Sequence, residues 1–425
     1  MANGATIAQV ADIINSDEGR RYTVVSAPGK RDKNDVKVTD LLYACYDEIV
    51  KNGNCDNSFK IINKRFEDIA NSLSLDIDIN TLLDEVKRDM EKSVSKELCA
   101  SRGEYLSARL LAVKLGAEFV DAAGLIMFDD GGNLLLDKSI ENLKTRLNGV
   151  YRAVIPGFYG TDESGRVRTF SRGGSDISGA IVARAMNAEV YENWTDVDGF
   201  LSADPRIVDK PQLIDCLSYR ELRELAYMGA EVLHPESIFP VRSAGIPINI
   251  KNTFNPTHKG TMIVADGKLV EDHKVITGIA GRKGFTIINI ATDMMNSEIG
   301  FGRRVLSVLE EEGISFEHVP SGIDTLSVVI RDEYLGGKMQ KILARLYESV
   351  GGDNIEIHSG LSLIATVGHN MASRHGTAAT LFGALAKNHV NVRMIDQGSS
   401  ELNIIVGVDT FDYEKTINAI YHAFY

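Results

Sequence analysis

The last third of the chain contains an internal repeat, and this repeat limits what that part can fold into. A shift of 76 residues, applied from Lys274 onward, aligns identical residues without a gap. The identical pairs are Gly284/Gly360, Ile288/Ile364, Met295/Met371, Gly300/Gly376, Leu309/Leu385, Gly322/Gly398 and Leu326/Leu402. A period this long that occurs twice indicates a duplicated small domain rather than a solenoid.

Each repeat has the same apolar pattern, which predicts the order strand, helix, strand, strand, helix. In the first repeat the five segments are 285–290, 302–312, 315–319, 326–330 and 337–348. We therefore expect two βαββαβ domains, at residues 274–350 and 351–425.

Residues 1–265 have a different hydrophobicity pattern, in which short apolar runs alternate with longer amphipathic stretches. The predicted strands include 22–25, 150–155 and 247–250, and the predicted helices include 81–94, 96–115, 178–186 and 218–227. This alternation predicts an α/β domain with a largely parallel sheet between helices. In such sheets ligands bind beyond the carboxyl ends of the strands, so we expect the site in the loops after Val25 and Ile155.

Charge and cysteine content narrow the class of protein. The chain has 46 basic and 59 acidic residues, a net charge of −13, which argues against nucleic acid or an anionic membrane as a partner. No run approaches 18 apolar residues, and there is no secretory signal. The four cysteines are scattered without C-x-x-C spacing, which favours reduced thiols in the cytoplasm over disulfides, and no metal site is predicted.

The strongest local signal is the segment Ser171-Arg-Gly-Gly-Ser-Asp176, which a helical pattern follows directly. Consecutive glycines let backbone N–H groups approach an anion, and the start of a helix adds a favourable dipole. Arg172 offers a bidentate fork for a carboxylate or phosphate, and Asp176 places a carboxylate beside it. A plain turn with an Asp helix cap is the alternative interpretation.

Three weaker segments also carry polar groups, and each has a structural alternative. The segment Trp194-Thr-Asp-Val-Asp-Gly199 and Arg206 offer groups for a ribose, an adenine edge and a phosphate, although Asp and Gly are common in turns. Glu104, expected in the first turn of a helix, is either an acceptor for a substrate ammonium or a residue that favours the helix dipole. Ser26 and Thr39 flank a charged loop at the end of a predicted strand.

Taken in order, these segments resemble aspartate kinase, a member of the amino-acid kinase superfamily with C-terminal paired ACT domains. The matching stretches are Val24-Val-Ser-Ala27, Val38-Thr-Asp-Leu-Leu42, Gly103-Glu104, Val154-Ile-Pro-Gly-Phe-Tyr-Gly160, Arg172-Gly-Gly-Ser-Asp176, Trp194-Thr-Asp-Val-Asp-Gly199, Ala203-Asp-Pro-Arg206, Gly229-Ala-Glu-Val-Leu-His-Pro235 and Asn252-Thr-Phe-Asn-Pro256. The resemblance covers essentially the whole chain, and several motifs in the right order are more specific than any one alone.

The resemblance implies transfer of the γ-phosphoryl group of ATP, with Mg²⁺, to the side-chain carboxylate of L-aspartate. The product, 4-phospho-L-aspartate, feeds lysine, threonine and methionine synthesis. By resemblance the catalytic residues are Asp176 and Arg172. The implied substrate-binding residues are Ser26, Thr39, Glu104, Phe158, Arg172 and Ser175, and the implied ATP-binding residues are Gly173, Gly174, Thr195, Asp196, Leu201 and Arg206.

Two departures from the family pattern bear on activity. The family begins with a strand leading into Lys-Phe-Gly-Gly-Ser-Ser, whose lysine faces the β- and γ-phosphates, and this sequence has no such segment. We therefore expect the polypeptide as written to be poorly active, through a late start or truncation. Glu231 stands where many members have a basic residue near the nucleotide, so no ATP contact is assigned to it.

ACT pairs of this family bind end-product amino acids, and the resemblance implies an effector pocket in the first repeat. Its residues would be Met295, Gly300, Phe301, Ser315, Phe316, Glu317 and Asp324. The acidic Glu317 and Asp324 would suit lysine, alone or with threonine. A homodimer or higher assembly through the ACT domains is also expected. The alternatives are a related kinase with another acceptor, and a non-catalytic sensing partner of a full-length kinase.

Overall fold

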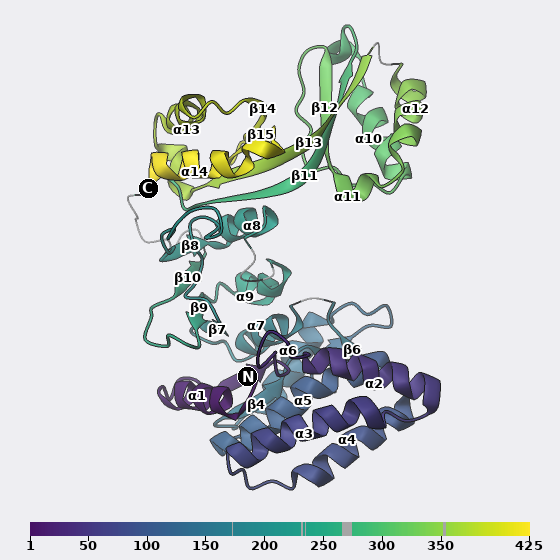
Figure 1. Ribbon diagram of the computed structural model, residues 1–425, viewed down its shortest axis with the longest axis vertical. Helices are drawn as coiled ribbons and strands as arrows, with labels where there is room; N and C mark the ends of the chain where they lie inside the picture. The colour runs from purple at the N-terminus through teal and green to yellow at the C-terminus, as the bar shows by residue number, and fades with distance from the viewer. Residues whose placement is uncertain (172, 231–232, 234, 266–273, 352–353) are drawn as a thin grey trace. The chain divides into compact units, whose positions relative to one another are not determined.

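The computed structural model describes residues 1–171, 173–230, 233, 235–265, 274–351 and 354–425 (Figure 1). The chain divides into two compact units, Met1–Gly199 with Leu233–Lys268, and Phe200–Val232 with Leu269–Tyr425. Residues 200–232, which the sequence places in the first domain, group with the second unit.

Helices make up much of the first unit. They are α1 (Gly4–Asn15), α2 (Val38–Asn52), α3 (Asp56–Ser72), α4 (Ile79–Ser93), α5 (Lys96–Leu115), α6 (Leu136–Leu147), α7 (Gly174–Ala185), the 3₁₀ turn η1 (Pro235–Ile238) and α9 (Phe239–Ala244). The ends of α5 follow from its sequence, because the Ser95 hydroxyl accepts a hydrogen bond from the Leu98 N–H and Gly116 ends the helix in a left-handed conformation.

The strands of the first unit form three small sheets. They are β1 (Tyr22–Val25), β2 (Glu118–Phe119), β3 (Met127–Phe128), β4 (Ala153–Pro156), β5 (Tyr159–Asp162), β6 (Val167–Thr169), β7 (Tyr191–Thr195), β9 (Ile248–Asn252) and β10 (Thr261–Val264). Strand β4 lies between β1 and β2, with both pairings parallel. β7 runs parallel to β9, and β9 is antiparallel to β10. β5 pairs parallel with β3 and antiparallel with β6. Within the described residues of this unit, β1 pairs only with β4 and β7 only with β9.

The core of the first unit has two layers, one on each side of β4, because successive side chains of this strand point to opposite faces. Val154 packs with α1 to α5, whereas Ala153 and Ile155 pack with α6 and α7. Neighbouring side chains of a strand point to opposite faces, so β4 is covered on both sides by helices. The predicted α/β fold with a parallel core is confirmed, with antiparallel strands added at β6 and β10.

The second unit is built around a five-stranded antiparallel sheet in the order β12-β11-β13-β15-β14. Its strands and helices are β8 (Cys216–Ser218), α8 (Tyr219–Tyr227), β11 (Gly278–Ala291), η3 (Met295–Ser297), α10 (Phe301–Glu311), β12 (Thr325–Arg331), α11 (Asp332–Leu335), α12 (Met339–Val350), β13 (Asn354–Val367), η4 (His369–Ser373), α13 (Thr377–Lys387), β14 (Val392–Asp396), β15 (Asn403–Asp409), η5 (Thr410–Asp412) and α14 (Tyr413–Phe424).

The internal repeat appears in this sheet as two halves that share the long strands β11 and β13 (Figure 1). The second part of β11 and the first part of β13 pair beside β12, and the remaining parts pair beside β15. Each long strand passes from one half of the sheet to the other at a glycine, Gly284 in β11 and Gly360 in β13. Their φ angles of 90° and 73° are ones that glycine adopts readily. The repeated glycines therefore mark the point where each strand passes from one repeat to the other.

One strand that the sequence predicts in the first repeat is not a regular strand in the structure. The segment 315–319 has no regular strand, and an isolated bridge joins His318 to Val329 of β12. The equivalent segment of the second repeat is the regular strand β14.

Each repeat has its own apolar core, under α10 and α12 in the first and under α13 and α14 in the second.

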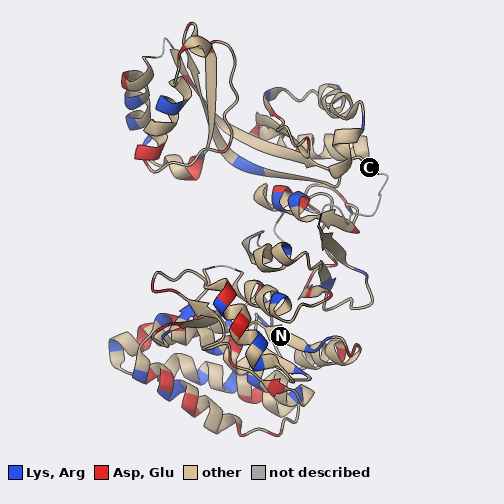
Figure 2. Ribbon diagram, turned by 180° about the vertical axis from the view of Figure 1, so that it is seen from behind, with Lys and Arg blue, Asp and Glu red and all other residues tan. Residues whose placement is uncertain are grey.

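The described residues form no membrane-spanning helix, and their charged side chains are of mixed sign. None of their helices is both long and apolar enough to cross a membrane. Acidic and basic residues are interspersed along the helices of both units (Figure 2).

Candidate active site

The loops that follow β1 and β4 lie side by side at one edge of the first unit's sheet. Val25 pairs with Pro156, and the Gly157 N–H donates a 2.9 Å hydrogen bond to the Val25 carbonyl. Since parallel strands end at the same edge, Ser26 and Phe158 are brought to neighbouring positions although they are distant in sequence.

The turn between β4 and β5 packs closely against the start of α7. A Cβ added to Gly157 would lie 2.9 Å from Ser175, and one added to Gly174 would lie 2.7 Å from the Phe158 ring. Phe158 has a positive φ of 74°, and its N–H donates a 3.1 Å hydrogen bond to the hydroxyl of Ser178 in α7. The close approach brings Ser175 to the carboxyl end of β4.

The glycine-rich segment forms the start of α7, as predicted. Gly173 is the N-cap residue, with a left-handed φ of 58°, and Ser175 and Asp176 lie in the first turn. The exposed N–H groups of a helix N-terminus attract an anion. Arg172, which the sequence assigns to substrate and catalysis, lies outside the described residues.

Asp176 is held by two residues of β7 that the sequence analysis missed. The Asn193 side-chain amide donates a 2.8 Å hydrogen bond to Oδ1 of Asp176. The Tyr191 hydroxyl donates a 3.2 Å hydrogen bond to the Asp176 carbonyl. Gly179 makes room for Tyr191, because a Cβ there would lie 2.6 Å from the tyrosine oxygen. No motif links these residues in sequence, so only the folded chain shows the contact.

Glu104 is a buried carboxyl that lacks a full set of partners. It lies in the middle of α5, not in a first turn, so the helix dipole does not explain it. It is 5% exposed, and its Oε2 has no hydrogen-bond partner. Burial raises the pKa of Glu104 from its ordinary value of 4.5 to about 7, although a hydrogen bond from the Ala27 backbone opposes the shift.

Glu104 faces the loop that carries Ser26. A Cβ on Gly103 would lie 2.7 Å from the Cβ of Ala27, so glycine allows α5 to approach this loop. Ser26 directly follows β1, and Thr39 is in the first turn of α2. The first unit therefore brings Ser26, Glu104, Phe158, Ser175 and Asp176 to the carboxyl ends of β1, β4 and β7.

The predicted nucleotide loop begins where β7 ends. Thr195 is the last residue of β7, and its hydroxyl donates a 3.2 Å hydrogen bond to Oδ1 of Asp196. Further along the loop, Asp198 accepts hydrogen bonds of 2.9 and 3.1 Å from the side chains of Asn252 and Asn255. These bonds lower the pKa of Asp198, which is therefore a structural carboxylate that fixes the loop.

Leu201 and Arg206, also predicted to contact ATP, belong to the second unit. Leu201 forms a bridge with Leu213, and the Arg206 guanidinium makes an ion pair with Asp204 at 2.6 Å. Glu231 lies outside the described residues.

The predicted effector residues have different environments within the first repeat. Met295 and Phe301 belong to the apolar core, and Gly300 caps α10 with a φ of 84°. Ser315 and Phe316 are exposed. The exposed Asp324 accepts a 2.9 Å hydrogen bond from the Met294 N–H.

Glu317 of the same set is already paired within the second unit. Its Oε1 lies 2.7 Å from Nε of Arg331, and its other oxygen accepts a hydrogen bond from the Tyr227 hydroxyl. The Arg331 guanidinium also lies over the Tyr227 ring, 5.1 Å from its centre. The 4% exposed Glu317 side chain therefore connects α8 to β12.

The described residues contain no group of three or more His, Cys, Asp or Glu side chains placed to hold a metal ion.

A parallel α/β core with a glycine-rich turn and a helix N-terminus at its strand ends is an arrangement that suits phosphoryl transfer, and the chain's relatives identify the class as the amino-acid kinases. The Amino acid kinase family model matches residues 1–252, and an ACT domain model matches residues 364–424. The chain belongs to the aspartokinase family and is an aspartate kinase.

Relatives support this assignment over the whole chain. The chain is 38% identical to Aspartokinase 3 of Bacillus subtilis (strain 168), over 100% of this chain and 96% of that protein. The crystal structure of Clostridium acetobutylicum aspartate kinase is 51% identical, with a TM-score of 0.91 over 100% of this chain and 97% of that one.

Two E. coli aspartokinase III structures are also similar. The complex with aspartate and ADP (R-state) is 25% identical, with a TM-score of 0.74 over 99% of this chain and 97% of that one. The complex with lysine and aspartate (T-state) is 26% identical, with a TM-score of 0.73 over 100% of this chain and 97% of that one.

Proposed function

We propose that the chain transfers the γ-phosphoryl group of ATP to the side-chain carboxylate of L-aspartate, as the first step toward lysine, threonine and methionine. The observation that carries the proposal is Glu104, a buried carboxyl with an unpartnered oxygen beside the loop after β1. A substrate ammonium would supply the missing partner. An N-acetylated acceptor has no such charge, so Glu104 favours a free amino acid.

The reaction requires little from the protein beyond positioning the two substrates and stabilising their negative charge. The acceptor carboxylate is already ionised at neutral pH, because its reference pKa is about 3.9. The barrier comes from bringing two anions together, which oriented N–H groups and cations lower. Gly173, Gly174 and the N-terminus of α7 supply the N–H groups, and Arg172 would bind the α-carboxylate.

The remaining pocket residues have steric and orienting roles. Ser26, Thr39 and Ser175 would offer hydroxyl groups to aspartate, and Phe158 would form one wall. Asp176 would lie beside the transferring phosphoryl group, held in orientation by Asn193.

ATP is the expected donor, in agreement with the ADP bound to E. coli aspartokinase III. Thr195 and Asp196 would contact the ribose and base side of the nucleotide. Mg²⁺ would neutralise the phosphates and stabilise charge in the transition state. The cytoplasm, where ATP and aspartate are supplied, is the expected compartment.

Feedback inhibition by lysine, alone or with threonine, is the proposed regulation. The E. coli relative that was solved with lysine supports this choice. Since Glu317 is paired with Arg331, Asp324 is the more accessible carboxylate of the predicted set for a lysine ammonium. Assembly into a homodimer or larger oligomer through the ACT domains is also proposed, and light scattering would measure it.

Trapping of aspartyl phosphate with hydroxylamine tests the proposed reaction. We expect ATP-dependent hydroxamate with L-aspartate, and none with glutamate or N-acetylglutamate. A parallel assay with the segment Lys-Phe-Gly-Gly-Ser-Ser added upstream tests the predicted contribution of the phosphate-binding lysine. Folded protein that forms no aspartyl hydroxamate in either form would contradict the proposal.

A further inference from the structure

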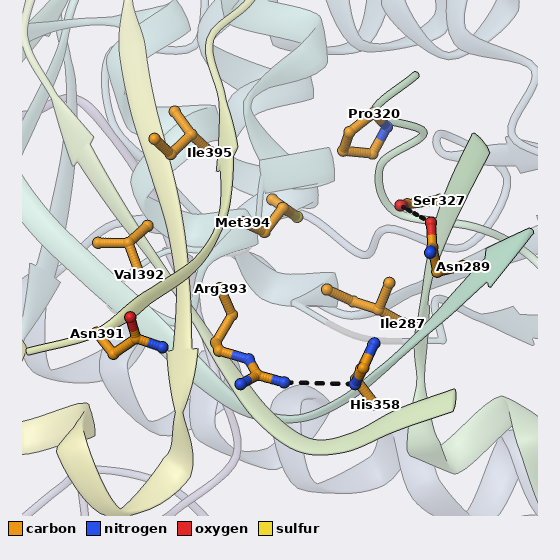
Figure 3. Close-up of a pocket in the computed structure, with 10 residues that line it drawn as sticks. All are labelled: Ile287, Asn289, Pro320, Ser327, His358, Asn391, Val392, Arg393, Met394 and Ile395. Atoms are coloured by element: carbon orange, nitrogen blue, oxygen red, sulfur yellow. Dashed lines mark hydrogen bonds between the residues drawn. The ribbon is translucent and has the colours of Figure 1, made fainter. Parts of the chain in front are cut away.

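Arg65 of helix α3 is buried, and its guanidinium holds a loop from inside the first unit. The side chain is 2% exposed. Nη1 donates a 2.9 Å hydrogen bond to the Val36 carbonyl, and Nη2 donates a 2.5 Å hydrogen bond to the Gly29 carbonyl. By comparison, the exposed Arg393 of the second unit donates to a side chain, that of His358, beside a pocket (Figure 3). Arg65 instead binds the main chain of the loop that connects β1 to α2.

The β1–α2 loop (residues 26–37) is described in full and has neither helix nor strand. Its main-chain hydrogen bonds from Asp35 to Asp32 and from Val38 to Pro28 are long, at 3.3 and 3.5 Å. The tip of the loop is exposed. Segments with exposed backbone and few strong bonds open readily unless neighbouring elements hold them. The conformation of this loop therefore depends on the side chains that bind it.

Asp35 completes the attachment of the loop to Arg65. Its Oδ2 accepts a 2.8 Å hydrogen bond from Nη2 of Arg65 and another of 2.8 Å from the Arg31 N–H. Its Oδ1 accepts a 2.9 Å hydrogen bond from Nη2 of Arg31. The hydrogen bonds from Arg31 hold the pKa of Asp35 well below its usual range, so the carboxylate stays charged and balances the buried guanidinium.

The two carbonyls that Arg65 binds belong to opposite arms of the loop, and each arm leads to a predicted substrate residue. Gly29 follows Ser26 by three residues, and Val36 precedes Thr39 by three. We propose that Arg65 is a positioning residue for the amino-acid substrate, because it joins both arms and so fixes Ser26 relative to Thr39. The inference rests on the function proposed above, in which these two hydroxyl groups bind aspartate.

The substrate ends of the same two arms rest against α5. A Cβ on Gly103 would lie 2.7 Å from the Cβ of Ala27 and 3.5 Å from Cγ1 of Val38, so both ends of the loop contact α5 beside Glu104. The loop is therefore held at its ends by α5 and further along by Arg65. Loss of the second attachment would leave the ends in contact with α5 but free to change their spacing.

The shape of the guanidinium suits this role. Arginine presents several donors in a rigid fork, so one side chain can bind carbonyls of both arms and a carboxylate at once. Lysine keeps the charge but has a single nitrogen, which cannot reproduce the fork. Arg65→Lys therefore removes the connection between the arms without leaving Asp35 unbalanced.

Calorimetric titration of the full chain with L-aspartate tests the proposal without relying on phosphoryl transfer. We expect Arg65→Lys to raise the Kd for aspartate by about tenfold, because Ser26 and Thr39 lose their fixed spacing. An arginine with a purely structural role would lower the fraction of folded protein, and so the stoichiometry of binding, without changing the Kd of the folded molecules. Arg88→Lys, at an exposed position of α4, is the matched control and should bind aspartate as the parent does.

A milder pair of variants tests the loop itself, and it decides the matter if Arg65→Lys does not fold. Asp35→Asn removes the ion pair with Arg65 and should raise the Kd by about threefold, since the bonds to the two carbonyls remain. Asp32→Asn, in the same loop, is its control, because the Asp32 side chain binds only the Asn34 N–H and should leave the Kd unchanged.

The rate of tryptic cleavage after the exposed Lys30, Arg31 and Lys33 reports the hold on the loop directly. It should increase in Arg65→Lys and Asp35→Asn, and aspartate should slow it in the parent. Parent values of the Kd and of the cleavage rate in Arg65→Lys, or in Asp35→Asn if the lysine variant does not fold, would overturn the proposal. A folded parent that does not bind aspartate would overturn it as well. A parent that binds aspartate but forms no aspartyl hydroxamate would contradict the proposed reaction alone and leave the role of Arg65 to be decided by these Kd values.

Discussion

The side-chain amide of Asn193 donates a 2.8 Å hydrogen bond to Oδ1 of Asp176 and so connects the third residue of β7 to the first turn of α7. The same amide lies 3.3 Å from the Tyr191 hydroxyl, which in turn donates to the Asp176 backbone. The predicted catalytic carboxylate therefore has an orientation that the neighbouring strand determines, in addition to its place in the glycine-rich turn.

Asn193→Leu is expected to lower kcat by about tenfold and to change KM for aspartate by less than about twofold. The substitution keeps the shape of the side chain but removes a hydrogen bond to a charged group, worth about 1.5 kcal/mol. Asn193→Asp should be worse, because it places a second negative charge beside Asp176. Steady-state kinetics with both substrates measure the effect.

The control for this pair is Asn80→Leu, at an exposed position of α4. Its kinetics should match those of the parent enzyme. Equal activity of Asn193→Leu and the parent would show that the contact does not orient Asp176 for catalysis.

Glu104→Gln is expected to raise KM for aspartate by about tenfold to a hundredfold, with a smaller change in kcat. The variant keeps the size of the side chain but cannot form a buried ion pair with the substrate ammonium, and hydrogen bonds to charged groups contribute about 1.5–3 kcal/mol. Glu85→Gln, on the exposed surface of α4, is the matched control. An unchanged KM would remove Glu104 from the substrate site.

The raised pKa of Glu104 also predicts how stability depends on pH. The folded state holds the proton up to a pKa of about 7, whereas the ordinary value is 4.5. Between these values the folded state binds more protons than the unfolded state, so stability falls as the pH rises. Without aspartate, this contribution should decrease by on the order of 3 kcal/mol between pH 4.5 and 7.

Urea unfolding of the parent and of Glu104→Gln across this pH range measures that contribution. The amide introduced by the substitution cannot titrate, so the unfolding free energy of the parent minus that of the variant should fall with rising pH. A difference that stays constant with pH would show that folding does not raise the pKa of Glu104.

Arg331→Gln is expected to lower the free energy of unfolding by about 3 kcal/mol, because it leaves the buried Glu317 carboxylate without its cation. Tyr227 would also lose the guanidinium that lies over its ring. Thermal unfolding measures the effect, and Arg303→Gln on the exposed side of α10 should change little. A melting temperature equal to that of the parent would show that the pair contributes nothing to stability.

The parts of the structure that depend on local sequence could be predicted, and the parts that depend on tertiary contact could not. The bounds of β1 and α5 were predicted correctly, because β1 is a short apolar run and α5 has a capping residue at each end. The 76-residue repeat predicted the duplicated half-sheets. The sharing of β11 and β13 between repeats could not be predicted, since the two halves of each strand pair with different neighbours.

The same distinction applies to the site. The glycine-rich turn at Gly173 is a local pattern, and its place at the start of α7 was predicted. The contact of Asn193 with Asp176 and that of Glu317 with Arg331 join residues 17 and 14 positions apart in different elements. A sequence pattern indicates that a polar group is present, but only the fold shows which partner it meets.

Asp324→Asn is expected to raise the lysine concentration for half-inhibition by about tenfold, with kcat unchanged. The asparagine can still accept the hydrogen bond from the Met294 N–H, so the loop should keep its conformation while the charge that attracts a lysine ammonium is lost. Glu310→Gln, at an exposed position of α10, removes the same charge elsewhere in the first repeat and should not change inhibition. Inhibition curves measured at a fixed aspartate concentration decide the matter. If Asp324→Asn and the parent are inhibited equally by lysine, the ammonium is bound elsewhere.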